Sequence, residues 1–432
     1  MITAGISPEQ APSLHIPITL FLFAPLATIV AGVWISITGV DLLTTGWAPP
    51  TIGLTHIATL GMLAPVMFGA IYQLIPVVGG APVPWPKLAP VMTLMWLVGV
   101  VGLISGFAGI WSSGVLVAIW CLGPAIFLFA IPSAFGIART PRKTPTVIGL
   151  GLAICGLLLT ATFGLWMAHG HAAMNFPGPR PLWIQVHLGL GLLNWVGALL
   201  IAASWQLVPM FYLTPAPPQR VAKGSLAALM ISMLLTPASL FFPGEPWARG
   251  LAFAAAAPAG LAIWVVHPLW VLQAIRKRRR KRVDGSLEFW RLAMPTALLL
   301  APLSIATWQL GSPKFGILFI WLAVWGWAGA VIHGMLTRIV PFLIWFHRFS
   351  HLVGRPGVPS MRDLQPDKWT RRGFWAHLVS LILGAAAITT GLDPLCRATG
   401  VAVAGVGAHL LFVMLHLLRQ RADHLDRSLP GG

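Results

Sequence analysis

The chain has few charged residues. Only 9% of its 432 residues are charged, whereas 57% are hydrophobic, and a soluble domain carries about 25% charged residues. This shortage excludes a soluble enzyme, a disordered chain and a repeat scaffold. Apolar runs of about 20 residues recur along the whole sequence, which predicts a polytopic membrane protein built of helices. A membrane β-barrel would instead show short alternating segments.

Cysteine and acidic residues are also scarce. Three cysteines cannot form a disulfide framework, and no Cys-x-x-Cys-His motif is present for covalent attachment of a c-type haem. All ten Asp and Glu fall in predicted loops or tails, so no predicted span has a carboxylate at its centre. This absence argues against a proton pump and against a transporter driven by Na⁺ or H⁺. The first fifteen residues hold no Lys or Arg, so we expect no cleaved signal peptide.

The hydropathy pattern predicts an all-α fold, a polytopic membrane bundle of twelve spans within a single transmembrane domain, residues 1–432. Clusters of Pro and Gly separate the apolar runs and mark the loops. The predicted spans are 16–38, 51–78, 88–109, 112–136, 146–168, 181–213, 222–243, 247–275, 289–309, 314–347, 373–391 and 397–418.

Basic residues are distributed unevenly between the two sides of this predicted bundle. With twelve spans both termini share one side, which receives 23 of the 28 Lys and Arg, whereas the other side receives four. Because cytoplasmic loops are enriched in Lys and Arg, we expect cytoplasmic termini and a bacterial-type inner membrane. The net charge of +18 does not indicate nucleic-acid binding, since it lies in short loops. The run Arg276–Arg282 is expected to contact lipid headgroups.

Three similar segments indicate an internal repeat. They are GAIYQLIPVV at 69–78, ASWQLVPMFY at 203–212 and GMLTRIVPFL at 334–343, and their prolines lie 133 and 132 residues apart. A period of four spans predicts three four-helix repeats, at about 16–136, 146–275 and 289–418, in a pseudo-threefold arrangement. The alternative is a common signal in which proline closes a helix.

Histidines inside the spans are the candidate functional residues. An imidazole within a bilayer is costly unless it is paired or binds a ligand, and haem iron in helical bundles is commonly held by His from facing helices. His56 and His187 have similar depths in spans two and six, and His333 and His409 are alternates in spans ten and twelve. The alternative is that these imidazoles only bond neighbouring backbone. His15, His347, His351, His377 and His424 are predicted to be interfacial.

Two further features carry candidate ligands. The stretch WMAHGHAAM at 166–174 places His169, His171 and Met174 in a predicted outer loop, and imidazole with thioether is a soft ligand set that suits copper. The alternative is that both histidines are solvated loop residues that bind no metal. Arg338 is the one charge inside the repeat helices. It is a candidate partner for a haem propionate, although snorkelling to the nearby interface is the favoured interpretation.

The segment HIATLGMLAPVMFGAIYQLIP at 56–76, the twelve spans and the repeat resemble subunit I of the haem-copper oxidase and nitric oxide reductase superfamily. The resemblance implies that His56 is an axial haem ligand. The chain departs from that family, because span ten has Phe319, Ile320 and Trp321 where a His-x-His would lie, and span seven has no His. A typical copper binuclear centre therefore cannot be built. The chain also resembles the NnrS-type haem- and copper-containing membrane proteins.

The sequence therefore predicts a membrane protein with non-covalent haem, b-type or another, that transfers electrons or binds and reduces a small diatomic such as nitric oxide. Copper is a second candidate cofactor. The expected partners are the lipid bilayer and an electron donor, either a protein or a quinol. Two other interpretations stay open, a metal-handling or transport protein that uses the 169–174 stretch and a non-catalytic assembly protein. No catalytic residue can be named from the sequence.

Overall fold

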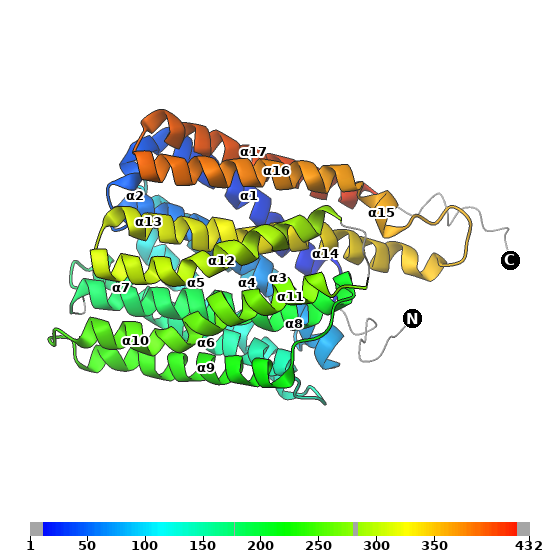
Figure 1. Ribbon diagram of the computed structural model, residues 1–432, viewed down its shortest axis with the longest axis horizontal. Helices are drawn as coiled ribbons and strands as arrows, with labels where there is room; N and C mark the ends of the chain where they lie inside the picture. Colours follow the sequence, from blue (N-terminus) through cyan, green and yellow to red (C-terminus); the bar gives the residue numbers. More distant parts are fainter. Residues whose placement is uncertain (1–11, 177, 280–283, 421–432) are drawn as a thin grey trace.

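The computed structural model describes residues 12–176, 178–279 and 284–420. Within these ranges all regular structure is helical, and twelve helices are long and apolar enough to cross a membrane. The predicted fold, a twelve-span helical bundle of a multi-pass membrane protein, is confirmed. The helices run roughly along one axis, and because their number is even, the first begins and the last ends at the same end of the bundle (Figure 1).

In chain order the spans consist of α1 (His15–Thr38), α2 and α3 (Pro49–His56, Ala64–Gly79), α4 (Leu88–Phe107), α5 (Gly114–Ala138), α6 (Pro145–Ala172), α7 and α8 (Arg180–Gly189, Ala198–Tyr212), α9 (Gln219–Ala238), α10 and α11 (Ala248–Leu261, His267–Arg276), α12 (Gly285–Leu310), α13 and α14 (Pro313–Trp321, Ala330–Phe349), α16 (Asp367–Thr390) and α17 (Asp393–Arg419). The short α15 (Met361–Leu364) lies between α14 and α16.

Spans two, six and ten form the inner part of the bundle. Their most apolar windows are 83%, 72% and 61% buried by protein, whereas the other spans reach 39–56%. Each inner span contains a π-helical segment, and these segments, η3 (Ile57–Leu63), η4 (Leu190–Gly197) and η7 (Leu322–Gly329), begin 133 and 132 residues apart. This spacing equals that of the repeat prolines, and a further π-helical segment, η6 (Ala262–Val266), lies in span eight. A π-helical turn frees a carbonyl from the usual ladder, and Trp96 Nε1 donates to the carbonyl of Leu60 at 2.9 Å.

The repeat prolines lie inside their helices, as in the predicted spans 51–78, 181–213 and 314–347, so the alternative in which proline closes each helix does not hold. Pro76 and Pro209 each lie three residues before the end of their helix, and α14 continues for eight residues beyond Pro341. Proline inside a membrane helix is tolerated because neighbouring groups satisfy the freed carbonyl.

Several span ends differ from the prediction. The fifth span continues to Ala172 instead of residue 168, and the eleventh and twelfth begin at Asp367 and Asp393. The early starts have a physical reason, since an acidic side chain in the first turn stabilises a helix that extends beyond the apolar layer.

Glycines let the first and last spans approach closely. A Cβ on Gly32 would lie 2.3 Å from the backbone nitrogen of Ala404, and one on Gly400 would lie 2.3 Å from Ser36 Oγ. Small residues permit such contact between membrane helices. The last span therefore packs against the first, and α1 packs in turn against span two.

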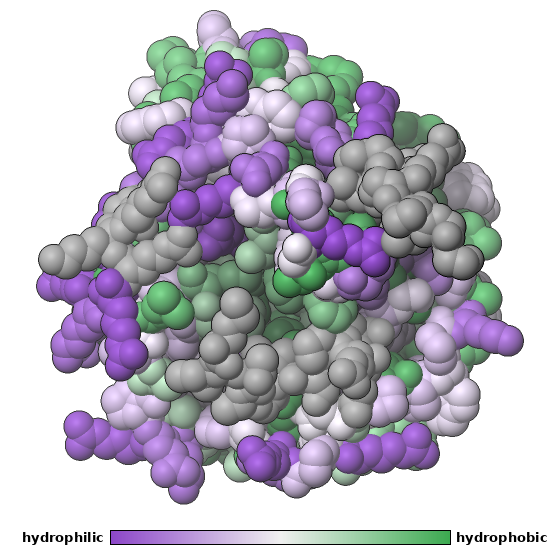
Figure 2. All heavy atoms as spheres, turned by 90° about the vertical axis from the view of Figure 1, so that its right-hand side faces the viewer, coloured by the Kyte–Doolittle hydropathy of each residue, from purple (hydrophilic) through white to green (hydrophobic). Residues whose placement is uncertain are grey.

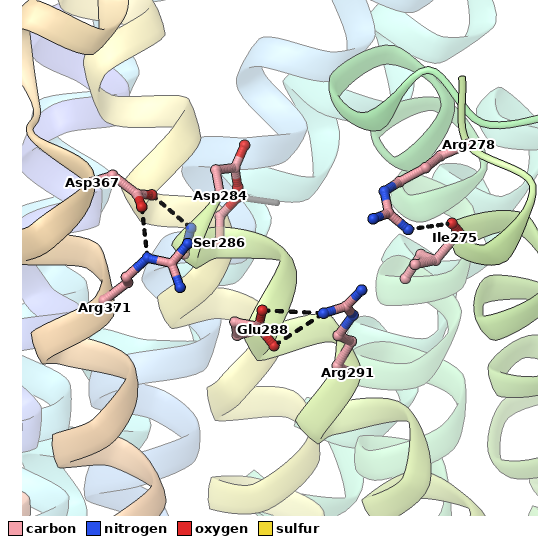
Figure 3. Close-up of polar contacts among 9 residues, drawn as sticks. Ile275, Arg278, Asp284, Ser286, Glu288, Arg291, Asp367 and Arg371 are labelled. Atoms are coloured by element: carbon pink, nitrogen blue, oxygen red, sulfur yellow. Dashed lines mark hydrogen bonds and ion pairs between the residues drawn. The ribbon is translucent and has the colours of Figure 1, made fainter. Parts of the chain in front are cut away.

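The two ends of the bundle differ in character. Figure 2 looks onto the end at which α17 ends, and hydrophilic residues surround an apolar hollow there. We call this the termini face and the other end, where span two begins at Pro49, the opposite face. The polar contacts of Figure 3 lie near the termini face, where α12 begins. Arg371 Nε pairs with Asp367 Oδ2 at 2.7 Å, and Arg291 pairs with Glu288 at 3.2 Å.

Candidate functional site

His56 and His187 meet near the opposite face. His56 is the last residue of α2 and His187 lies in α7, each seven residues into its span. Their ring centres are 6.5 Å apart and the ring planes differ by 24°. The structure therefore brings together the two histidines on which the haem prediction depends.

Backbone carbonyls orient both rings. His56 Nδ1 lies 2.8 Å from the carbonyl oxygen of Ile52, one turn earlier in its own helix, and His187 Nδ1 lies 3.0 Å from that of Thr160 in α6. A carbonyl can only accept, so in each ring Nδ1 carries the proton and donates. The Nε2 lone pair is then left to bind a ligand, and a carbonyl that fixes the tautomer is the usual partner of a metal-bound imidazole.

The separation of the rings agrees with ligation of a single metal ion. With metal–nitrogen bonds of about 2.0 Å, two imidazoles on opposite sides of one ion have ring centres about 6.3 Å apart. The observed 6.5 Å and the small interplanar angle match this arrangement. A haem iron accepts two axial ligands in this way, one from each face of a planar porphyrin.

The surroundings of the pair suit an apolar, planar group. Phe107, at the end of α4, stacks on His56 with ring centres 6.2 Å apart. Gly164 leaves room for the other ring, because a Cβ there would lie 2.8 Å from His187 Cε1. Both rings and the neighbouring Leu188 are only partly buried, although they belong to the two most enclosed spans. These residues fit a haem.

The π-helical segments adjoin the pair. The segment η3 begins at Ile57, directly after His56, and η4 begins three residues after His187. Such insertions are frequent at functional sites because they shift the facing of the residues beside them.

His333 and His409 lie in a different cluster, together with His377. His333 Nδ1 is 3.4 Å from His377 Nδ1, and His377 Nε2 is 3.2 Å from the carbonyl oxygen of Trp325. A Cβ on Gly373 would lie 3.2 Å from both His333 Nε2 and His409 Cδ2. His409 Nε2 is bound to a backbone carbonyl at 2.9 Å.

Dense packing around this cluster leaves little room for a porphyrin. His333 and His377 are 5% and 0% exposed, and aromatic rings press against both, with Phe289 centred 4.5 Å from His333 and Trp325 centred 4.2 Å from His377. The alternate haem ligands therefore gain no support. His377, which the sequence analysis placed at the interface, is in fact part of the buried core.

The suggested copper ligands do not converge. His169 and His171 belong to the last turn of α6 instead of a loop, and residues two apart on a helix do not face each other. His169 is exposed, the ring of His171 packs 5.3 Å from that of Phe107, and Met174 is 90% exposed. In the described part of the chain no group of three or more His, Cys, Asp or Glu is placed to hold a metal ion.

Arg338 has a partner of its own. Its Nη2 lies 3.1 Å from Asp284 Oδ2, and its guanidinium carbon lies 5.7 Å from the centre of the Phe211 ring. Arg338 precedes Pro341 by three residues, as Gln73 precedes Pro76, and Gln73 is 17 residues from His56. At 1.5 Å per residue this register places Arg338 about 25 Å from the His56 level. Arg338 is therefore too distant to bind a propionate of a haem held by His56 and His187.

Comparison with known proteins assigns no family. A scan against protein-family models and a search of curated proteins both found no match for this chain.

Several residues of the site were missed by the sequence reasoning. Phe107, Gly164 and the carbonyl of Thr160 lie on α4 and α6, and nothing in the sequence pairs these spans with His56 or His187. The one available signal was Gly164 itself, since a glycine within an apolar helix often marks a close approach.

Proposed function

We propose that this protein is an integral membrane haem protein that transfers electrons, with His56 and His187 as the axial ligands. The observation that carries the proposal is the facing pair of imidazoles, with ring centres 6.5 Å apart and both Nδ1 atoms at carbonyls. When bound, the haem supplies one-electron redox chemistry. The chain fixes the tautomer and orientation of both ligands and surrounds them with apolar side chains.

Two protein ligands favour electron transfer over catalysis on a diatomic molecule. A six-coordinate iron has no open position, so nitric oxide or carbon monoxide would bind only after one imidazole leaves. Each imidazole here is held by a backbone hydrogen bond, which opposes such a departure. The resemblance to the oxidase superfamily remains part of the proposal, supported by the twelve spans and by the nearly equal spacing of the π-helical segments in spans two, six and ten.

The proposal is tested by the haem content of the purified protein. After expression with ample haem, we expect about one non-covalent haem per chain and sharp absorption bands in the reduced state. These bands should be unchanged by carbon monoxide. A colourless protein after such growth would refute the proposed function. An absorption band that shifts with carbon monoxide would show that the role is ligand binding and not electron transfer.

We further propose that the termini face is cytoplasmic and that the membrane is a bacterial-type inner membrane, since the predicted loops and tails on that side hold 23 of the 28 Lys and Arg. A reporter enzyme active only in the periplasm should be silent when fused after Arg427. The same reporter inserted at Asn175, in the loop between α6 and α7, should be active. The reverse pattern would show that the orientation is the opposite one, with the His56–His187 pair near the cytoplasm.

A further inference from the structure

A separate cavity lies on the other side of span two from the histidine pair. It has a volume of about 170 Å³ and is enclosed by spans one, two, ten, eleven and twelve. Span two faces it with Leu54, Thr55, Ala58 and Met62, whereas His56 on the same span faces His187. Trp321 is among the other lining residues.

The polar side chains that line the cavity have no free hydrogen-bond donor for a bound molecule, because each already donates to another group of the protein. The four threonine hydroxyls donate to backbone carbonyls at 2.7–3.2 Å, and the two indoles and the thiol are also bonded. The donors concerned are Thr28, Thr51, Thr55, Thr399, Trp321, Trp325 and Cys396. A quinone or a sugar, which needs donors for its oxygens, would therefore bind here poorly.

The cavity continues toward the opposite face. A second, smaller cavity shares Leu43, Ile317 and Ile388 with it and is also lined by Lys314. Lys314 is exposed at the start of α13, and its Nζ donates to the carbonyl of Thr389 at 2.8 Å. An apolar cavity thus continues to the exposed ammonium group of Lys314 at the opposite face.

We propose that this cavity binds an acyl chain of a membrane phospholipid, with the headgroup phosphate at Lys314. A cavity of about 150 Å³ with an apolar lining stays dry and accepts hydrocarbon guests, and this one has comparable volume. The lack of donors selects a chain without polar groups, and the lysine at the mouth complements the phosphate. The proposal is independent of the haem.

Photolabelling in lipid vesicles tests the proposal directly. The full chain is reconstituted into phosphatidylglycerol vesicles that contain the same lipid with a diazirine at the chain end, illuminated, and mapped by peptide mass spectrometry. We expect adducts on Met62 and Val324, which are 5% and 7% exposed and out of reach of bulk lipid. Val401, 67% exposed on α17, reports ordinary labelling by the bilayer.

Two variants in which a larger side chain fills part of the cavity, and one control variant, test the site of labelling. Ala387→Phe and, as a milder change, Ala58→Leu should remove the adducts on Met62 and Val324 but keep those on Val401. Ala408→Phe, on the exposed face of α17, should label like the wild type. The proposal would be overturned if the wild type showed no adducts on Met62 and Val324, or if both variants kept those adducts.

The headgroup contact is tested separately with Lys314→Ala. Loss of one cation at the membrane surface should lower the deep labelling about fivefold, with Val401 labelling unchanged. Equal deep labelling in this variant would overturn the phosphate contact.

Discussion

His56→Ala should remove most of the haem from the purified protein. The substitution deletes one of two iron ligands, and the remaining one, His187, depends for its orientation on a carbonyl of another helix, Thr160 in α6. A single imidazole that is held only through helix packing gives the iron a weak anchor. Loss of a group that only hydrogen-bonds to a ligand already costs about 10–100-fold in metal affinity, so deletion of a ligand should lower the bound haem at least about tenfold and leave a Soret band that is absent or strongly shifted.

The matched control is His169→Ala, an exposed imidazole near the same face. Its haem content and spectrum should equal those of the wild type, and the elution volume in detergent should be the same for both variants. If His56→Ala elutes normally and keeps the wild-type spectrum, His56 is not a ligand. The cluster of His333, His377 and His409 would then be tested next.

His187→Ala should keep haem but change its spin state. His56 remains well oriented without His187, because its Nδ1 bonds to Ile52 in the same helix and Phe107 packs against its ring. The iron is then five-coordinate, so a low-spin spectrum becomes high-spin, and the reduced protein binds carbon monoxide. Absorption spectra of the reduced variant before and after carbon monoxide measure both effects.

Added imidazole distinguishes a lost ligand from a distorted fold. The space that the deleted ring leaves is bordered by Gly164 and should admit free imidazole, which restores the low-spin spectrum. A variant that stays low-spin without imidazole would show that His187 does not bind the iron.

The fold was largely predictable because a bilayer imposes simple rules. Long apolar segments must be helical there, and the twelve predicted spans all exist. Their ends were less predictable, since charged residues such as Asp367 and Asp393 continue a helix beyond the apolar layer. The π-helical segments carry no hydropathy signal.

The candidate site was predictable only in part. Depth and the cost of a buried imidazole selected His56 and His187, and the structure does place their rings together. The same reasoning kept His333 and His409 as alternates, because a sequence does not show which helix faces pack tightly. It also misplaced His377, whose position between Trp325 and His333 depends on the packing of span eleven against span ten.

The most direct test of the central claim is low-temperature electron paramagnetic resonance of the oxidised wild-type protein, purified after growth with ample haem. Two axial imidazoles enforce a low-spin ferric iron, so we expect a low-spin signal that accounts for the bound haem and is lost in both His56→Ala and His187→Ala. A high-spin signal in the wild type, or a low-spin signal that survives both substitutions, would contradict ligation by His56 and His187.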